Sequence, residues 1–160
     1  MNLLGIAMIL LADGATLIAL LACVALLVPA AEQRAREILN TSLWRAFLLG
    51  LVNFLFFGAL MFVFARIGQG GRGIVAAILF LIALLDGLGM TLLFLLGLSA
   101  LTGLVGERMG EASSALGRHL RGSVLVVLAG LTPWLGWFVF SPIVLLTGFG
   151  AAIKAIVRRK

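Results

Sequence analysis

The chain has 160 residues, of which 63% are hydrophobic and 11% are charged, and its mean hydropathy is +1.25. An average soluble domain carries about 25% charged residues, so this composition excludes an ordinary water-soluble globule. A net charge of +6 would suggest a nucleic-acid partner in a soluble protein, but here the basic residues flank apolar runs. Lys and Arg in that position contact lipid phosphates. We therefore expect one membrane domain over 1–160, with lipid and not nucleic acid as its surroundings.

Four apolar segments are long enough to cross a bilayer, because about 20 helical residues span its roughly 30 Å of hydrocarbon. They cover residues 3–28, 46–64, 74–101 and 123–153. None shows the period-two alternation of a barrel strand, so each is expected to be a helix that satisfies its own backbone groups. The first segment lacks a basic leader and contains Asp13, which favours a retained membrane helix over a signal peptide.

An internal repeat organises these segments. A shift of 73 residues superimposes Leu11-Ala12-Asp13-Gly14 on Leu84-Leu85-Asp86-Gly87, and Leu43-Trp44-Arg45 on Leu116-Gly117-Arg118. The halves, about 1–72 and 73–160, each read as helix, charged connection, helix, and so form a parallel repeat. The sequence thus predicts an all-α integral membrane fold, a four-transmembrane-helix bundle built as two tandem helical hairpins.

The connections carry most of the charge. The first is helix-favouring over 31–39 and is either an interfacial helix or an extension of a spanning helix. The second, 68–73, is glycine-rich without the Lys-Ser/Thr ending of a phosphate-binding loop, and is expected to be a flexible turn.

Loop Lys and Arg residues normally report orientation, but here the two sides tie at six each. One side would hold Arg66, Arg72, Lys154, Arg158, Arg159 and Lys160, and the other Arg34, Arg36, Arg45, Arg108, Arg118 and Arg121. The sequence therefore leaves the membrane side of each connection open.

Two acids, Asp13 and Asp86, lie inside predicted spans, where an uncompensated charge costs about 2.5–3.5 kcal/mol. No Lys or Arg lies equally deep, so we expect them to be hydrogen-bonded or neutral, with Asn53, Thr16 and Thr91 as candidate donors. Three roles stay open. The acids bond across a helix interface, pair with a basic residue of a partner, or share a proton or cation along a pathway.

Most of the predicted packing and anchoring residues lie in the second half of the chain. Pro133 should kink the fourth segment, and Gly136, Gly148 and Gly150 should allow close helix approach. The indole groups are expected to anchor at the headgroup level, namely those of Trp44, Trp134 and Trp137.

Catalytic and metal-binding patterns are missing from the sequence. The only cysteine is Cys23 and the only histidine is His119, so neither a zinc cluster nor bis-histidine haem ligation can form within one chain. His119 is expected to be an interfacial side chain, and no hydrolase motif occurs. We predict a protein that is not an enzyme, without catalytic residues, metal or cofactor.

Several segments together resemble the polytopic membrane domain that is fused to, or encoded beside, bactofilin-type polymer-forming proteins of bacteria. They are Pro29 with the Arg/Glu-rich 32–38, Leu43-Trp44-Arg45 with Gly50, Leu116-Gly117-Arg118, Pro133-Trp134-Leu135-Gly136-Trp137, and Gly148-Phe149-Gly150-Ala151. The chain departs from the family in lacking a polymerising β-rich domain, and in placing Asp13 and Asp86 where the family pattern is apolar. The resemblance implies a membrane anchor or scaffold for a cytoskeletal or envelope assembly and transfers no active-site residue.

The sequence thus favours a multi-pass inner-membrane scaffold or accessory subunit that packs against membrane or cytoskeletal partners, or against copies of itself. Two alternatives stay open. One is a proton or cation channel or transporter that uses Asp13 and Asp86, and the other is a small subunit of a respiratory or photosynthetic complex.

Overall fold

The computed structural model describes residues 3–71, 73–110, 114–132 and 134–157. In order along the chain, its elements are α1 (Leu3–Leu27), α2 (Pro29–Thr41), α3 (Leu43–Gly70), α4 (Ile74–Arg108), α5 (Ala115–Leu131), the π-helical turn η1 (Gly136–Phe140) and α6 (Ser141–Val157). Every regular element in these ranges is helical, as the sequence predicted. Four helices, counting η1 with α6, are long and apolar enough to cross a membrane.

The helix boundaries follow from local chemistry. Val28 precedes Pro29, which disfavours a helical conformation at Val28 and suits the first turn of a new helix, so α1 ends and α2 begins there. Ser114 caps α5, because its hydroxyl accepts a hydrogen bond from the Gly117 amide at 3.0 Å. The segment expected to be either an interfacial helix or an extension of a spanning helix is therefore a separate helix, α2.

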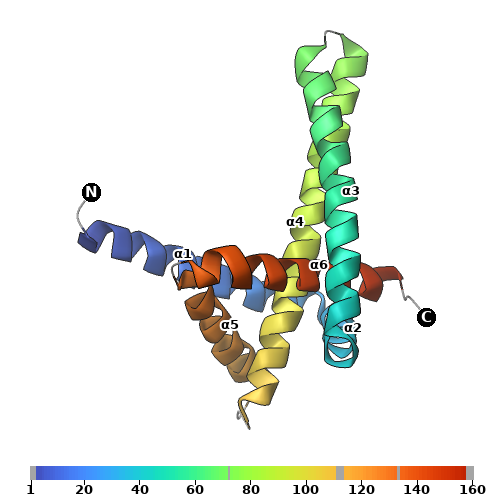
Figure 1. The fold of residues 1–160 in the computed structure, drawn as a ribbon. Helices are drawn as coiled ribbons and strands as arrows, with labels where there is room; N and C mark the ends of the chain where they lie inside the picture. The colour runs from blue at the N-terminus through green and yellow to red at the C-terminus, as the bar shows by residue number, and fades with distance from the viewer. Residues whose placement is uncertain (1–2, 72, 111–113, 133, 158–160) are drawn as a thin grey trace.

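The α3–α4 hairpin dominates the shape (Figure 1). The two long helices run antiparallel, and α6 crosses the lower part of both. α1 and α5 pack against α4, and α2 lies beside the lower ends of the pair. Beyond the crossing with α6, where Phe94 still stacks on Phe149, residues 51–70 and 74–92 project as a two-helix arm, which we call the distal hairpin. At about 1.5 Å per residue it is roughly 30 Å long, which matches the hydrocarbon thickness of a bilayer.

Helix pairing follows the expected tandem hairpins only in part. As the second hairpin requires, α4 packs against α5 and α6. However, α3 pairs with α4, across the boundary expected between the repeat halves, and α1 packs against α4, α5 and α2. The helix expected over 123–153 is divided, because α5 ends at Leu131 and α6 begins at Ser141. Thr132 is extended, as residues before proline usually are, whereas Pro133 itself lies outside the described residues.

The core lies where the helices cross. Its main cluster joins α2, α3, α4 and α6 and consists of Ala35, Ile38, Leu39, Ala46, Ala100, Leu104, Ala151 and Ala155. Glycines set the closest contacts. A Cβ at Gly97 would lie 2.0 Å from the Gly148 carbonyl oxygen, and one at Gly150 would lie 1.9 Å from that of Ala46. Gly148 and Gly150 thus lie at the α4–α6 and α3–α6 crossings, where only a hydrogen side chain fits.

Candidate functional site

A partly buried ion-pair network ties α2 to the end of α4. Glu32 is only 3% exposed, and its Oε1 accepts hydrogen bonds from Arg36 Nη2 at 2.5 Å and Nε at 3.2 Å. Arg36 Nη1 also donates to Glu107 Oε1 on α4. Gly103 makes room for the guanidinium, because a Cβ there would lie 2.4 Å from Arg36 Nη2. One arginine therefore bridges two carboxylates from different helices.

The network shifts the protonation of both partners on α2. Burial raises the pKa of Glu32, with a smaller rise from Glu107, although the hydrogen bond and charge of Arg36 act in the opposite direction. Burial alone would lower the pKa of Arg36, but the hydrogen bonds and charges of Glu32 and Glu107 outweigh it and raise that pKa. Arg36 therefore stays a cation, and Glu32 takes up a proton at a higher pH than an ordinary glutamate does.

His119 forms a second polar cluster next to this network. It is 4% exposed, so its side chain is packed inside the protein. Its Nε2 lies 3.1 Å from Ser99 Oγ and 3.4 Å from Thr102 Oγ1. Ser99 donates its own proton to the Leu21 carbonyl and Thr102 to the Ser99 carbonyl, so both hydroxyls accept from the ring. The neutral imidazole is thus protonated at Nε2.

Two causes keep this imidazole neutral. Burial lowers the pKa of His119, and the positive charge of Arg36 lowers it further. The ring and the Glu32 network share the wall of a cavity of about 240 Å³, which opens between α2 and α5. Its lining is part polar (Glu32, Gln33, Arg36, Arg118, His119) and part apolar or glycine (Ala25, Leu26, Pro29, Gly103, Ala115, Leu116). This arrangement can hold a proton and locks α1, α2, α4 and α5 together.

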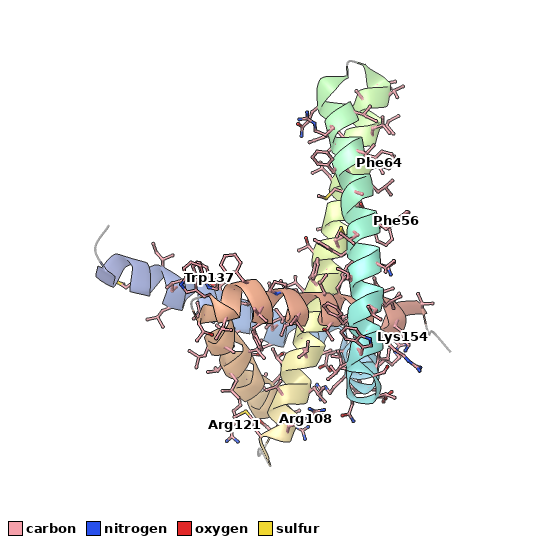
Figure 2. The ribbon with its side chains drawn as sticks, in the orientation of Figure 1. Phe56, Phe64, Arg108, Arg121, Trp137 and Lys154 are labelled. Atoms are coloured by element: carbon pink, nitrogen blue, oxygen red, sulfur yellow. The ribbon has the colours of Figure 1, made fainter. Side chains whose placement is uncertain are left out.

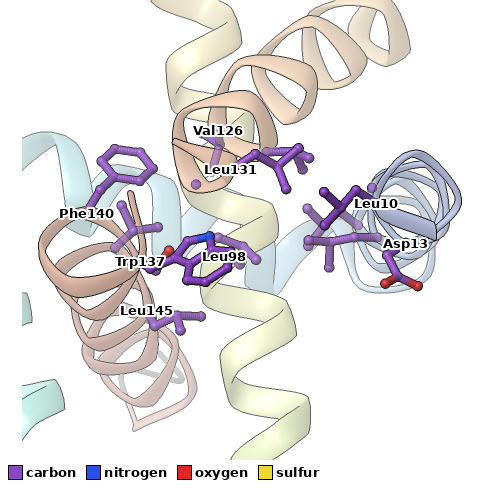
Figure 3. Close-up of a pocket in the computed structure, with 15 residues that line it drawn as sticks. Leu10, Asp13, Leu98, Val126, Leu131, Trp137, Phe140 and Leu145 are labelled. Atoms are coloured by element: carbon purple, nitrogen blue, oxygen red, sulfur yellow. The ribbon is translucent and has the colours of Figure 1, made fainter. Parts of the chain in front are cut away.

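A larger, apolar pocket of about 340 Å³ lies among α1, α4, α5, η1 and α6 (Figure 3). Leu10, Leu98, Val126 and Trp137 are among its walls, and its few polar lining residues are Asp13 and Ser141. The pocket is about the size of small-ligand sites, and its walls would suit an acyl chain.

The two predicted intramembrane acids have separate surroundings. Asp13 is exposed on α1 and lines the apolar pocket. Asp86 lies in the distal hairpin, where its Oδ2 is buried without a hydrogen-bond partner among the described residues. No hydrogen bond or pocket in the described chain joins the two acids.

The donors expected for these acids are engaged elsewhere. Asn53 donates to the Leu49 carbonyl at 2.8 Å, Thr16 to Ala12 at 2.8 Å and Thr91 to Gly87 at 2.9 Å. Each bond closes within its own helix, four residues back, because that carbonyl is always in reach of a helical side chain. The expectation that these three side chains bond the acids was therefore wrong.

The remaining predicted residues lie on the surface or in the α5–η1 turn. Trp44, Trp134 and Trp137 are 68%, 78% and 60% exposed, and Trp44 stacks on Phe47 with ring centroids 5.5 Å apart. Gly136 is buried, and a Cβ there would lie 2.6 Å from the carbonyl oxygens of Ala129 and Gly130. Gly136 therefore allows the chain to fold back on the end of α5.

Sequence reasoning missed Ser99, Thr102 and Gly103 as members of the polar cluster. In an apolar helix such residues read as generic small packing positions. The signal that was present is their spacing, since Ser99, Thr102 and Gly103 lie three and four residues apart and so face one side of α4. Within the described ranges no group of three or more His, Cys, Asp or Glu side chains could hold a metal ion.

These features define a helical protein with four apolar helices of membrane-spanning length. At one end lies the ion-pair network of Glu32, Arg36 and Glu107, which we call the polar lock. No protein-family model, curated protein or solved structure matches the chain.

Proposed function

We propose that the chain is a multi-pass inner-membrane protein that acts, without catalysis, as an accessory or scaffold subunit for other membrane or envelope proteins. The distal hairpin carries this proposal. Large apolar side chains are exposed along it, namely Val52, Phe54, Leu55, Phe56, Met61, Phe62, Val63, Ile67, Ile74, Val75, Ile78, Phe80, Leu81, Ile82, Leu84, Leu85, Leu88 and Leu92. Figure 2 shows Phe56 and Phe64 on this arm, away from the other helices. Such a surface requires lipid or a partner to cover it.

Open glycines favour a protein partner for part of this surface. A Cβ at Gly58 on α3 or at Gly89 on α4 would meet no atom within 4 Å, in contrast to the glycines at the crossings. Small residues with free space above them allow another membrane helix to approach closely. The resemblance to bactofilin-associated membrane domains points to the same role, an anchor or scaffold for an assembly.

Site-specific photo-crosslinking in native membranes tests the proposal. A photoreactive amino acid at exposed Leu85 should give a crosslinked product with a defined partner or with a second copy of the chain. Met90 lies on the same helix but is only 8% exposed, so the same probe at that position should react within the chain. A chain that stays monomeric and uncrosslinked at Leu85 would refute the scaffold role.

A proton or cation pathway is the second candidate, and the buried Asp86 oxygen favours it. A carboxylate that no described side chain satisfies is costly at that depth, and such groups mark ion routes in membranes. Flux measured in liposomes should then fall for Asp86→Asn. Asp13→Asn tests whether the exposed acid takes part, and a flux that neither change lowers rejects the pathway.

A further inference from the structure

The structure distributes the charged residues differently from the six-to-six count that the sequence gives for four spans. In a four-span arrangement Lys154 falls on the side of Arg66, opposite Arg45. Instead, Lys154 and Arg45 line one polar hollow of about 550 Å³ together with Glu37, Thr41 and Ser42. The C-terminal end of α6 therefore lies beside the end of α2 and the start of α3.

One end of the molecule is strongly basic as a result. We define the base as α2 with residues 42–45, 107–110, 114–121 and 154–157. The described residues of the base include seven cations, namely Arg34, Arg36, Arg45, Arg108, Arg118, Arg121 and Lys154. They also include three carboxylates, namely Glu32, Glu37 and Glu107. The net charge of these residues is therefore +4. Figure 2 shows Arg108 and Arg121 at its lower edge. At the described part of the hairpin tip, Arg66 is the one charged residue.

This asymmetry has a physical consequence in a membrane. The cytoplasmic leaflet is rich in anionic lipids, and each Lys or Arg near it contributes about 1 kcal/mol of attraction. Short segments with many Lys and Arg residues accordingly stay on the cytoplasmic side. We propose that the base rests on anionic phospholipid headgroups of the cytoplasmic leaflet, and that the distal hairpin reaches across the bilayer with its tip on the opposite side. This inference rests on the proposed membrane location.

The Arg45–Lys154 hollow is the best-formed headgroup contact of this surface. The two cations flank the hollow, and Thr41 and Ser42 add hydroxyl groups to its wall. Trp44, in the first turn of α3, is 68% exposed beside it, which suits an indole at the headgroup level. Arg36 contributes less to the surface, because Glu32 and Glu107 already neutralise it.

Two matched glutamines test the orientation. In a Cys23→Ala background, Gln69→Cys places a single thiol near the tip and Gln33→Cys places one at the base, and both positions are exposed. A membrane-impermeant maleimide should label Gln69→Cys in intact spheroplasts, and Gln33→Cys only after permeabilisation. The reverse pattern overturns the orientation while the membrane location stands. Recovery of both proteins in the aqueous fraction overturns the membrane location as well.

Lipid preference tests the headgroup contact itself. With Trp134 and Trp137 changed to Phe, quenching of Trp44 by brominated phosphatidylglycerol and by brominated phosphatidylcholine can be compared in mixed vesicles. The preference for the anionic lipid should fall about fivefold for Arg45→Gln and again for Lys154→Gln, which corresponds to about 1 kcal/mol for each cation. Arg66→Gln, at the tip of the distal hairpin, should leave the preference for the anionic lipid unchanged. An undiminished preference in the Arg45→Gln/Lys154→Gln double variant overturns the contact.

Discussion

Arg36 is the residue on which the polar lock depends most. Its guanidinium holds the buried Glu32 carboxylate and reaches Glu107 on α4. Arg36→Met removes the cation and leaves Glu32 as an uncompensated buried charge, which should lower the free energy of unfolding by about 3–5 kcal/mol near pH 7. Thermal or denaturant unfolding in detergent measures this loss.

Arg34→Met is the matched control for this substitution. Arg34 lies on the same helix, and among the described residues it bonds only to the Ala30 carbonyl of that helix, at 2.9 Å, so its loss should cost less than about 0.5 kcal/mol. Because burial raises the pKa of Glu32, the Arg36→Met variant should recover part of its stability as the pH falls toward 5. Equal losses in the two variants would contradict the lock.

His119 should make folding sensitive to acid. Burial, and then the charge of Arg36, lowers its pKa in the folded state, so the folded protein favours the neutral ring. The stability that the neutral ring allows is fully present above about pH 6.5, the ordinary pKa of histidine. It is lost as the pH falls through 6.5 toward the lower pKa that His119 has in the folded state. Unfolding midpoints measured from pH 8 to pH 5 should therefore decline.

His119→Gln should flatten this decline, because its amide can donate to Ser99 without taking up a proton. Glu32 acts in the opposite sense. Its raised pKa makes the folded state bind a proton first, so it adds stability as the pH falls toward 4.5. The Glu32→Gln variant separates the two effects. A decline that persists unchanged in His119→Gln would assign it to another group.

At the level of helices, the close α4–α6 crossing depends on glycine. Gly97→Ala would place a methyl group 2.0 Å from the Gly148 carbonyl oxygen, so the helices must separate, at a cost of about 1–3 kcal/mol. Gly89→Ala lies on the same helix in open space and should instead stabilise it by about 0.5–1 kcal/mol. Unfolding followed by circular dichroism measures the change in the free energy of unfolding of each variant. An equal gain in stability in the two variants would contradict the close α4–α6 crossing.

The apolar helices could be predicted from the sequence, but their partners could not. The length and hydropathy of a segment indicate that it is a membrane-spanning type of helix, as for α1, α3 and α4. An almost uniformly apolar helix has no preferred side, so its pattern does not indicate which neighbour it packs against. For 123–153 the sequence predicted a kink at Pro133, but the run is apolar on both sides of that residue and so does not show that α5 and α6 are separate helices.

The polar lock was equally hard to predict. Glu32 and Arg36 are four residues apart, so a helix brings them together, but only tertiary packing shows that Glu107 and Gly103 approach them. The count placed Lys154 opposite Arg45 because it assumed that each apolar segment crosses the membrane once, whereas the two side chains line one hollow. The repeat, which rested on a few identities such as Asp13 with Asp86, likewise does not indicate that α3 pairs with α4.

For the whole molecule, the crosswise arrangement limits how it can lie in a flat bilayer. Helices that cross at a steep angle cannot all follow one membrane normal (Figure 1). The α3–α4 pair is best suited to follow it, since the distal hairpin has the length of the hydrocarbon layer and α6 ends at the base. We therefore expect α6 to lie along the cytoplasmic leaflet.

Spin labels along the two helices test this arrangement. In a reconstituted bilayer, labels at exposed Val52, Phe56 and Val63 on α3 should change depth by about 1.5 Å per residue, because a helix along the normal rises by that amount. Labels at exposed Ile143, Leu145 and Ile156 on α6 should stay at nearly constant depth. Oxygen and a water-soluble nickel chelate report depth through opposite gradients of collision rate. A depth gradient along α6 equal to that along α3 would mean that α6 crosses the membrane, which would restore the four-span arrangement and overturn the crosswise one.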